Sequence, residues 1–283
     1  MLALIETELE LLADGEIPQT HGHMVHGLFF RVLRRTEPDL CDSLHGVNGT
    51  LPFTLSTLYD SGEYPGMLTP GTVKGKQVCF RIGLFDDNLV TAVPYALSEA
   101  MIAGPVAIAG IPMNIKTIRV LKTEKIDDIE KNAAVLVDRL RTFRIDFQTF
   151  TSFRSEGRSL LFPEPRLIVT SLYRSWVTAG GHKVLDEVLG RIVRKVYPAR
   201  YDLHTGMLNM GRYFLNGFAG FCVYEAEESM TIEERLVLLN LLGMIPYAGI
   251  GYKTTMGMGQ ARYRVIAEKD AHNKAEINAS HAK

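Results

Sequence analysis

The chain has 283 residues, of which 46% are hydrophobic and 22% charged, and its formal net charge is −1. This composition is typical of a globular protein and excludes a wholly disordered, collagen-like or coiled-coil chain. The nearly balanced charge also excludes a uniformly basic nucleic-acid binder, although it allows a local basic surface.

The first half of the chain predicts the element order β-α-β-β-α-β. Residues 2–12 partly alternate apolar and polar side chains, which predicts a strand with one exposed face. A helical pattern runs from 21 to 44 with an interruption at Pro38, and Asp86 or Asp87 is expected to cap a helix that ends at Ala103. The other predicted strands are residues 53–58, 78–85 and 115–121.

The same order recurs after a polar, charged stretch, residues 122–131, which predicts a linker. Strands are predicted at 142–153, 200–208, 212–224 and 260–267, with helices at 163–178, 183–196 and 231–242. The last helix begins with a capping box, Thr231 and Glu234. The sequence therefore predicts an α+β fold of two tandem ferredoxin-like (βαββαβ) modules, 1–125 and 135–268, with a polar tail, 269–283.

Neither a membrane segment nor a disulfide framework is predicted. The longest nearly apolar run, residues 100–113, is shorter than the roughly 20 residues that span a bilayer, so we expect it to form core or, as the alternative, a homodimer contact. Three widely spaced cysteines without a CxxC pair are typical of a reducing compartment. These features predict a cytoplasmic protein.

Residues 248–260 (AGIGYKTTMGMGQ) hold four glycines between a predicted helix and a predicted strand. Glycine permits positive φ and lets backbone N–H groups approach an anion closely, and Lys253, Thr254 and Thr255 can donate to phosphate oxygens. The spacing differs from Walker and dinucleotide-binding motifs. The segment predicts either a phosphate-contacting loop or a flexible surface hairpin.

Histidines are the candidate catalytic side chains. His45 ends a predicted helix, where the partial negative charge of the helix terminus favours a protonated imidazole, so it is either a proton-transfer residue or a helix cap. His21, His23 and His26 suggest a metal site, but their spacing matches no zinc pattern, and no metal or cofactor is expected. His26 shares a helix face with Phe30.

Positive charge is concentrated between residues 139 and 212. This stretch contains thirteen Lys or Arg and six Asp or Glu, a local net charge of +7. This concentration is typical of a surface that binds a polyanion, and the alternative is an ordinary solvated surface. Five of the arginines lie in or beside one predicted strand, namely Arg139, Arg141, Arg144, Arg154 and Arg158.

Four segments together resemble the CRISPR RNA-processing endoribonucleases of the RAMP superfamily. They are SLHGVNGTLPFTLSTL at 43–58, FRIGLFDDNLV at 80–90, FTSFRSEGRSLLFPEPRLIVTSLYRSW at 150–176 and AGIGYKTTMGMGQAR at 248–262. The last segment is similar to the family's glycine-rich loop. The resemblance covers nearly the whole chain and agrees with two ferredoxin-like modules.

The resemblance implies an enzyme that cuts precursor CRISPR RNA once per repeat, without metal, by 2′-hydroxyl attack on the adjacent phosphate. The products carry a 5′-hydroxyl and a 2′,3′-cyclic phosphate. It makes His45 the leading general acid or base, without deciding which. Implied partners are the repeat RNA, other CRISPR-associated proteins and a second copy of the chain. The implied RNA-binding residues are Gly249, Gly251, Lys253, Thr254, Gly257, Gly259, Arg154 and Arg158.

The chain departs from the family pattern beside His45. Well-known members add a tyrosine on the first helix and a lysine soon after the histidine, whereas here Phe29 and Phe30 occupy that part of the helix and the next lysine is at position 74. Other members use a second histidine or an arginine from the first helix. The local candidates are His26, ranked first for its shared face with Phe30, then His23 and Arg31.

The missing tyrosine and lysine motivate a second hypothesis, a catalytically weak RNA-binding subunit that holds guide RNA in an effector complex. A third hypothesis is a ferredoxin-like protein without an RNA role. Turnover separates the first two hypotheses, and a steep dependence of affinity on salt separates both from the third.

Overall fold

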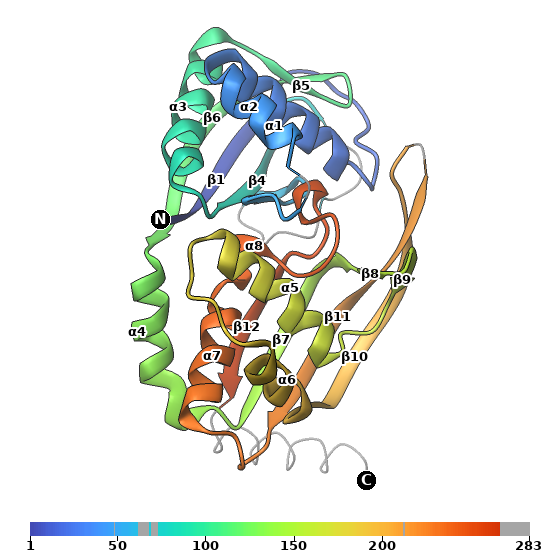
Figure 1. Ribbon diagram of the computed structural model, residues 1–283. Helices are drawn as coiled ribbons and strands as arrows, with labels where there is room; N and C mark the ends of the chain where they lie inside the picture. The colour runs from blue at the N-terminus through green and yellow to red at the C-terminus, as the bar shows by residue number, and fades with distance from the viewer. Residues whose placement is uncertain (48, 62–67, 69–72, 212, 267–283) are drawn as a thin grey trace.

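The computed structural model describes residues 1–47, 49–61, 68, 73–211 and 213–266. Two antiparallel sheets, each with its own helices, lie one above the other in Figure 1, the N-terminal module at the top. The tail predicted at 269–283 lies outside the described residues.

The N-terminal sheet has the strand order β2-β4-β1-β6-β5, with β3 paired to β4. Omitting the short β3 and β5 leaves the order β2-β4-β1-β6, in which each strand is antiparallel to its neighbours, as in a ferredoxin-like module. The elements are β1 (Leu2–Leu11), α1 (Gly22–Thr36), α2 (Pro38–His45), β2 (Phe53–Leu55), β3 (Tyr59–Asp60), β4 (Gln77–Leu84), α3 (Asp87–Ala103), β5 (Val106–Ile108) and β6 (Ile111–Glu124).

The C-terminal sheet repeats this arrangement with the order β10-β11-β7-β12. A separate hairpin, β8–β9, follows β7 and projects from the module in Figure 1. The α+β fold with two tandem ferredoxin-like modules is thus confirmed. The elements are α4 (Ile126–Leu136), η1 (Val137–Arg139), β7 (Thr142–Thr151), β8 (Phe153–Ser155), β9 (Arg158–Leu160), α5 (Pro165–Thr178), α6 (Asp186–Arg194), β10 (Val196–Asn209), β11 (Phe214–Ala226), α7 (Ile232–Gly243), α8 (Ile245–Ala248), η2 (Thr254–Met256) and β12 (Ala261–Ile266).

Helix boundaries follow local signals in the sequence. The Asp86 carboxylate accepts the backbone N–H of Leu89 at 3.1 Å and caps α3, which ends at Ala103 as predicted. The predicted capping box of Thr231 and Glu234 begins α7. Pro38 ends one helix and begins the next, because proline lacks the N–H that a continuous helix requires but fits a first turn.

The linker predicted at 122–131 is wrong. Strand β6 runs to Glu124, and α4 begins at Ile126. The buried side chains of Ile129 and Ala133, four residues apart, attach this helix to the core of the C-terminal module. Its other positions are mostly polar or exposed, so the overall polarity of the segment hides a narrow apolar stripe.

The expectation of one exposed face on β1 is also wrong. The strand is central in its sheet, between β4 and β6, and most of its residues are buried. Glu6 is only 7% exposed. Its carboxylate tolerates this burial because Arg81 and Arg119 donate to it at 3.0 and 2.8 Å. Ion pairing therefore lets polar residues occupy a covered face of the sheet.

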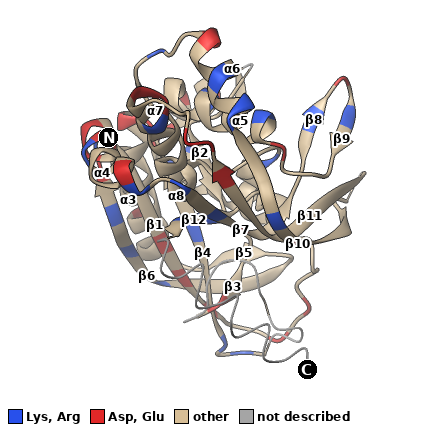
Figure 2. Ribbon diagram, turned by 90° about the horizontal axis from the view of Figure 1, so that it is seen from below, with Lys and Arg blue, Asp and Glu red and all other residues tan. Residues whose placement is uncertain are grey.

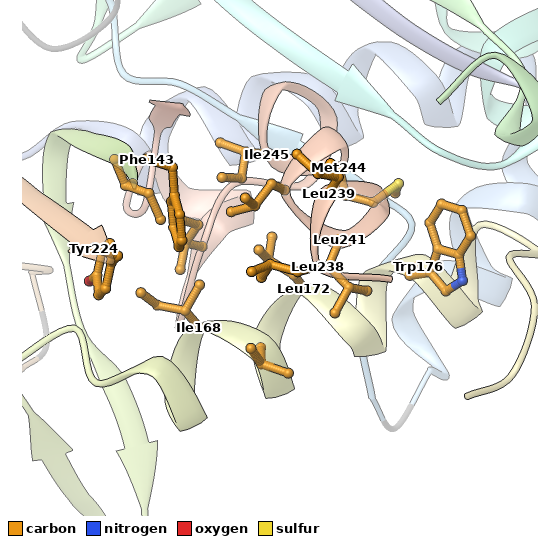
Figure 3. Packing of buried hydrophobic residues seen from close by; sticks show 14 of the residues in the cluster. Phe143, Ile168, Leu172, Trp176, Tyr224, Leu238, Leu239, Leu241, Met244 and Ile245 are labelled. Carbon is orange, nitrogen blue, oxygen red and sulfur yellow. The ribbon is translucent and has the colours of Figure 1, made fainter. Parts of the chain in front are cut away.

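Each module has its own hydrophobic core, although Leu2 and Phe85 of the N-terminal module pack in the core of the C-terminal one. In Figure 3 the core of the C-terminal module lies between α5, which carries Leu172 and Trp176, and α7, which carries Leu238 and Leu241. The apolar run at 100–113 supplies buried residues from β5 and β6 to the N-terminal core, although Ile102 at the end of α3 is 81% exposed. Among the described residues, no helix is both long and apolar enough to cross a bilayer.

Helix α8 connects the modules and positions the loop that follows it. The buried Thr54 hydroxyl in β2 donates to the Tyr247 carbonyl at 3.0 Å, and the Tyr247 hydroxyl donates to Glu124 at 2.6 Å. Both contacts reach from α8 into the N-terminal module. The glycine-rich loop, residues 249–260, therefore begins at a fixed point beside the first sheet.

Candidate active site

Helices α1 and α2 bring His26 and His45 into contact with the same phenyl ring, that of Phe30. The ring centroid of Phe30 lies 4.8 Å from that of His26 and 4.3 Å from that of His45. Phe53 of β2 supports the cluster, with its ring 6.2 Å from His26 and 5.8 Å from Phe30. The two histidines that were nineteen positions apart in the sequence are thus neighbours in space.

His26 is held in one tautomer by the glycine-rich loop. Its Nδ1 lies 3.0 Å from the Thr255 carbonyl oxygen, and since a carbonyl only accepts, Nδ1 carries the hydrogen. Burial lowers the pKa of His26, the bond to Thr255 partly opposes this, and the charges of Lys253 and His45 lower it further. The neutral ring therefore offers the lone pair of Nε2 as a base.

His45 is the last residue of α2 and is exposed to solvent. Its Nδ1 donates to the Cys41 carbonyl oxygen at 2.8 Å, one helical turn earlier. This bond leaves Nε2 directed away from the helix backbone. The predicted helix cap and the predicted proton-transfer role are therefore compatible, because the ring uses one nitrogen for each role.

His21, which precedes α1, and His23, in its first turn, have different surroundings. His21, 2% exposed, donates from Nδ1 to the Pro18 carbonyl and accepts the Leu58 N–H at Nε2, both at 2.7 Å. Neither nitrogen is then available to a metal ion, and burial lowers the pKa of this ring. His23 lies near Gly211, at the turn between β10 and β11, rather than beside Phe30.

Arg31 points to a different edge of the N-terminal sheet. Its Nη2 donates to the Ala107 carbonyl of β5 at 2.7 Å. Strands β5 and β2 are the two opposite ends of the sheet, and the histidine cluster contacts β2 through Phe53. The structure therefore does not bring Arg31 to His26 and His45.

The glycine-rich loop is folded against both modules. Tyr252 N–H donates to the Ser152 carbonyl at 2.8 Å, and Ile250 N–H donates to the Gly259 carbonyl at 2.8 Å within the loop. The short helix η2 contacts α1 and β2. The alternative of a flexible surface hairpin is therefore wrong.

The glycines shape this loop more than they offer donors. The N–H groups of Gly249, Gly251 and Gly259 donate to the Ile245 carbonyl, the Ser171 hydroxyl and the Phe150 carbonyl, at 2.8–3.1 Å. Gly251 has a φ of 95°, and a Cβ there would collide with the Ser152 carbonyl. Positive φ and close approach thus explain these three glycines, whose N–H groups already have acceptors within the protein.

Lys253 provides a cation beside His26. It has a φ of 59°, in the left-handed region that a lysine seldom adopts, and its charge is one of the causes that lower the His26 pKa. Strained backbone at a non-glycine residue persists only when surrounding contacts hold it, as at functional sites. Lys253, from the C-terminal module, therefore brings a positive charge to the surroundings of His26.

The predicted basic strand does not form one continuous surface. Arg144 donates to Asp146 at 2.8 Å, so its charge is paired. Arg139 and Arg154 flank opposite ends of β7, roughly 30 Å apart at the rise of a strand. Arg154 lies 5.5 Å from the centre of the Tyr252 ring, whereas Arg158 lies beyond it next to the tip of the β8–β9 hairpin.

Sequence reasoning missed Tyr252, Arg166 and Arg174, which surround a cavity beside the glycine-rich loop. Arg166, Thr170 and Arg174 recur every four residues and so share one face of α5. In the sequence, this four-residue spacing places two arginines and a threonine on one helix face. Only the tertiary structure shows that the glycine-rich loop lies on the same side of α5.

Comparison with known proteins identifies relatives of this chain. The family model of the CRISPR-associated endoribonuclease Cas6 matches residues 145–261. The Cas6 endoribonuclease of Streptococcus thermophilus is 26% identical over 147 residues, 49% of this chain and 60% of that protein. That of Mycobacterium tuberculosis is 24% identical over 184 residues, 61% and 57% of the two chains. Each alignment spans less than two thirds of the relative's length.

Solved structures share the fold. Cas6 of Thermus thermophilus in a product complex superposes with a TM-score of 0.75 at 23% identity, covering 93% of this chain and all of that one. A Cas6-related protein from Pyrococcus furiosus gives a TM-score of 0.60 at 14% identity, covering 95% and 100%. The chain is thus similar to Cas6 endoribonucleases over part of its sequence, and it shares the fold of the solved Cas6 structures.

Proposed function

We propose that the chain is an endoribonuclease that cuts CRISPR repeat RNA without a metal ion. The observation that carries the proposal is the placement of His26 and His45 around Phe30, with His26 bonded to the glycine-rich loop. The names of the curated relatives, CRISPR-associated endoribonucleases, support the same reaction. Precursor CRISPR RNA is the proposed substrate, and the product is a mature guide RNA.

The two histidines divide the proton transfers. His26, with Nδ1–H bound to Thr255 and a lowered pKa, takes the proton of the 2′-hydroxyl at Nε2. The freed oxygen forms a bond to the adjacent phosphorus, and the bond from phosphorus to the 5′ oxygen breaks. His45 at the helix end, as imidazolium, gives a proton from Nε2 to that leaving oxygen. The products are a 2′,3′-cyclic phosphate and a 5′-hydroxyl.

Lys253 stabilises the negative charge that develops on the phosphate oxygens. We assign to it the role that the lysine after the catalytic histidine has in well-known members. Thr254, the next residue, adds a hydroxyl at the start of η2. Donors fixed before the reaction act most strongly where charge increases in the transition state.

Replacing Lys253 by alanine is expected to lower the single-turnover cleavage rate about 10²-fold, the usual effect of removing one such donor. Removing its charge also raises the His26 pKa. The loss of activity on acidification, which follows protonation of His26, therefore begins at a higher pH than in the unaltered protein. Single-turnover rates across pH measure both effects, with Lys253→Arg as the charge-preserving control. An unchanged rate and profile would contradict this role.

The experiment that tests the function uses repeat RNA transcribed from the CRISPR array of the genome that encodes this chain. In EDTA, the protein is expected to cut it once and leave a 2′,3′-cyclic phosphate. A single 2′-deoxy nucleotide before the cut is expected to abolish cleavage, because it removes the nucleophile. Continued cutting of the deoxy substrate, or dependence on a divalent ion, would overturn the proposed chemistry.

A catalytically weak RNA-binding subunit is the second candidate, and it is favoured by one observation. Phe30, between the two histidines, has no hydroxyl and cannot transfer a proton. Multiple-turnover kinetics with excess repeat RNA distinguish the candidates, since a scaffold binds the RNA without turnover. The third candidate is a ferredoxin-like protein without an RNA role. It predicts that any residual affinity for RNA changes little with salt concentration.

A further inference from the structure

A polar cavity lies beside the glycine-rich loop. A cavity of about 230 Å³ opens between α5, the β8–β9 hairpin and the glycine-rich loop. This volume is slightly below the roughly 300–1,000 Å³ of pockets for drug-sized ligands, so it suits one nucleotide unit. The proposed cleavage step uses one residue of its lining, Thr254, and gives the rest of the cavity no role.

The lining of the cavity is basic. Arg166 and Arg174 of α5 face Arg154 of β8 across it, and hydroxyl groups of Thr170, Ser155 and other residues complete the polar part. No carboxylate lines it, and within the described ranges none of the three arginines forms a salt bridge. Figure 2 shows Lys and Arg on α5 and on the β8–β9 hairpin. Three such guanidinium groups around one cavity fit a phosphate group.

An aromatic ring forms another wall of the same cavity. The Tyr252 ring centre lies 5.5 Å from the Arg154 guanidinium carbon and 5.3 Å from the Lys253 Nζ. Both distances are near the outer limit of a cation–π contact, about 6 Å, so neither cation stacks tightly on the ring. A flat base can therefore stack on Tyr252 between groups that bind its phosphates.

The cavity and the proposed cleavage site share one loop. Thr254 lines the cavity, and the carbonyl of Thr255, the next residue, holds His26. A second cavity, about 490 Å³ and partly apolar, lies on the other side of the loop, where Met256, Gly257 and Met258 line it. A nucleotide on Tyr252 is thus close, through a short stretch of the loop, to the residue that holds His26.

We propose that this cavity binds one unpaired nucleotide adjacent to the scissile phosphate, with its base on Tyr252 and its phosphate among Arg154, Arg166 and Arg174. The inference rests on the proposed function and adds a binding site for one base to it. The site binds an unstacked base at one position of the repeat. Because that base is adjacent to the scissile phosphate, its binding sets the position of the cut.

The test is a double-mutant cycle that combines a change in the protein with a change in the RNA. Binding of fluorescein-labelled repeat RNA is measured by anisotropy in the His45→Ala background, in which the RNA stays intact. Abasic nucleotides are introduced singly on both sides of the cut, with and without Tyr252→Ala. Removing a stacked base is expected to weaken binding roughly 5- to 100-fold, at one position only, and Tyr252→Ala is expected to abolish that position's effect.

A second variant changes α5 instead of the glycine-rich loop, so its result does not depend on whether Tyr252→Ala disturbs the loop. Arg166→Gln with Arg174→Gln, on the face of α5 that lines the cavity, is expected to reduce the slope of log affinity against log salt by about 0.7 for each phosphate that the variant no longer binds. Arg194→Gln on α6 is the matched control and is expected to leave the slope unchanged. Tyr252→Phe, which keeps the ring, is expected to bind like the unaltered protein.

The outcomes separate the two proposals. Abasic and Tyr252→Ala effects that simply add at every position, together with an unchanged salt slope in the α5 variant, would overturn this inference and leave the proposed function standing. Failure of the unaltered protein to bind repeat RNA would overturn the proposed function and this inference with it.

Discussion

Replacing His45 by alanine is expected to lower the rate of repeat RNA cleavage by about 10²–10⁴-fold, the usual contribution of one positioned acid or base. Its exposed ring donates a hydrogen bond within its own helix, to Cys41, so removing the side chain is expected to leave the fold and RNA affinity intact. Single-turnover cleavage and anisotropy in EDTA measure the two quantities separately. Full activity of His45→Ala would remove it from the reaction.

His26→Ala is expected to lower the rate by a similar factor and to change its pH dependence. The base is active when neutral, and its pKa is below the ordinary value of about 6.5, so activity is expected to persist below that pH and to fall as His26 becomes protonated. In His26→Ala this acidic fall disappears. His182→Ala is the control, because its side chain is 86% exposed and belongs to the loop after α5. A fall that persists in His26→Ala would assign the base elsewhere.

A third large effect is expected for Gly22→Ala, at the first turn of α1. A Cβ at this position would collide with the Met256 carbonyl of η2. Overpacking of this kind costs about 1–3 kcal/mol, and here it also displaces the adjacent Thr255 carbonyl that holds His26. We therefore expect a lower free energy of unfolding and a reduced cleavage rate together.

Gly27→Ala is the matched control on the same helix. A Cβ there has no neighbour within 4 Å, and alanine is the better helix former by roughly 0.5–1 kcal/mol. The control is expected to raise the midpoint of thermal unfolding slightly and to leave cleavage unchanged. Equal behaviour of the two variants would show that contact between α1 and η2 does not matter for the site.

Local sequence patterns were sufficient for most of the secondary structure. The caps at Asp86 and Thr231 and the break at Pro38 are decided by groups within a few residues of one another, and the structure confirms them. Alternation and helical periodicity likewise place the strands and helices of both modules. The mistakes at 122–131 and β1 arose where a partner distant in the chain, α7 or Arg119, changed which residues are buried.

The sequence by itself determined that the chain forms two modules of repeated βαββαβ order, and it singled out His45, His26 and the glycine-rich loop. Only the tertiary structure decided how these parts meet. It joined His26 to Thr255, which is 229 residues away, brought the charge of Lys253 near His26 and turned Arg31 to another sheet edge. The physical reason is that local order follows from short-range hydrogen bonding and side-chain periodicity, whereas an active site depends on contacts between distant segments that only packing defines.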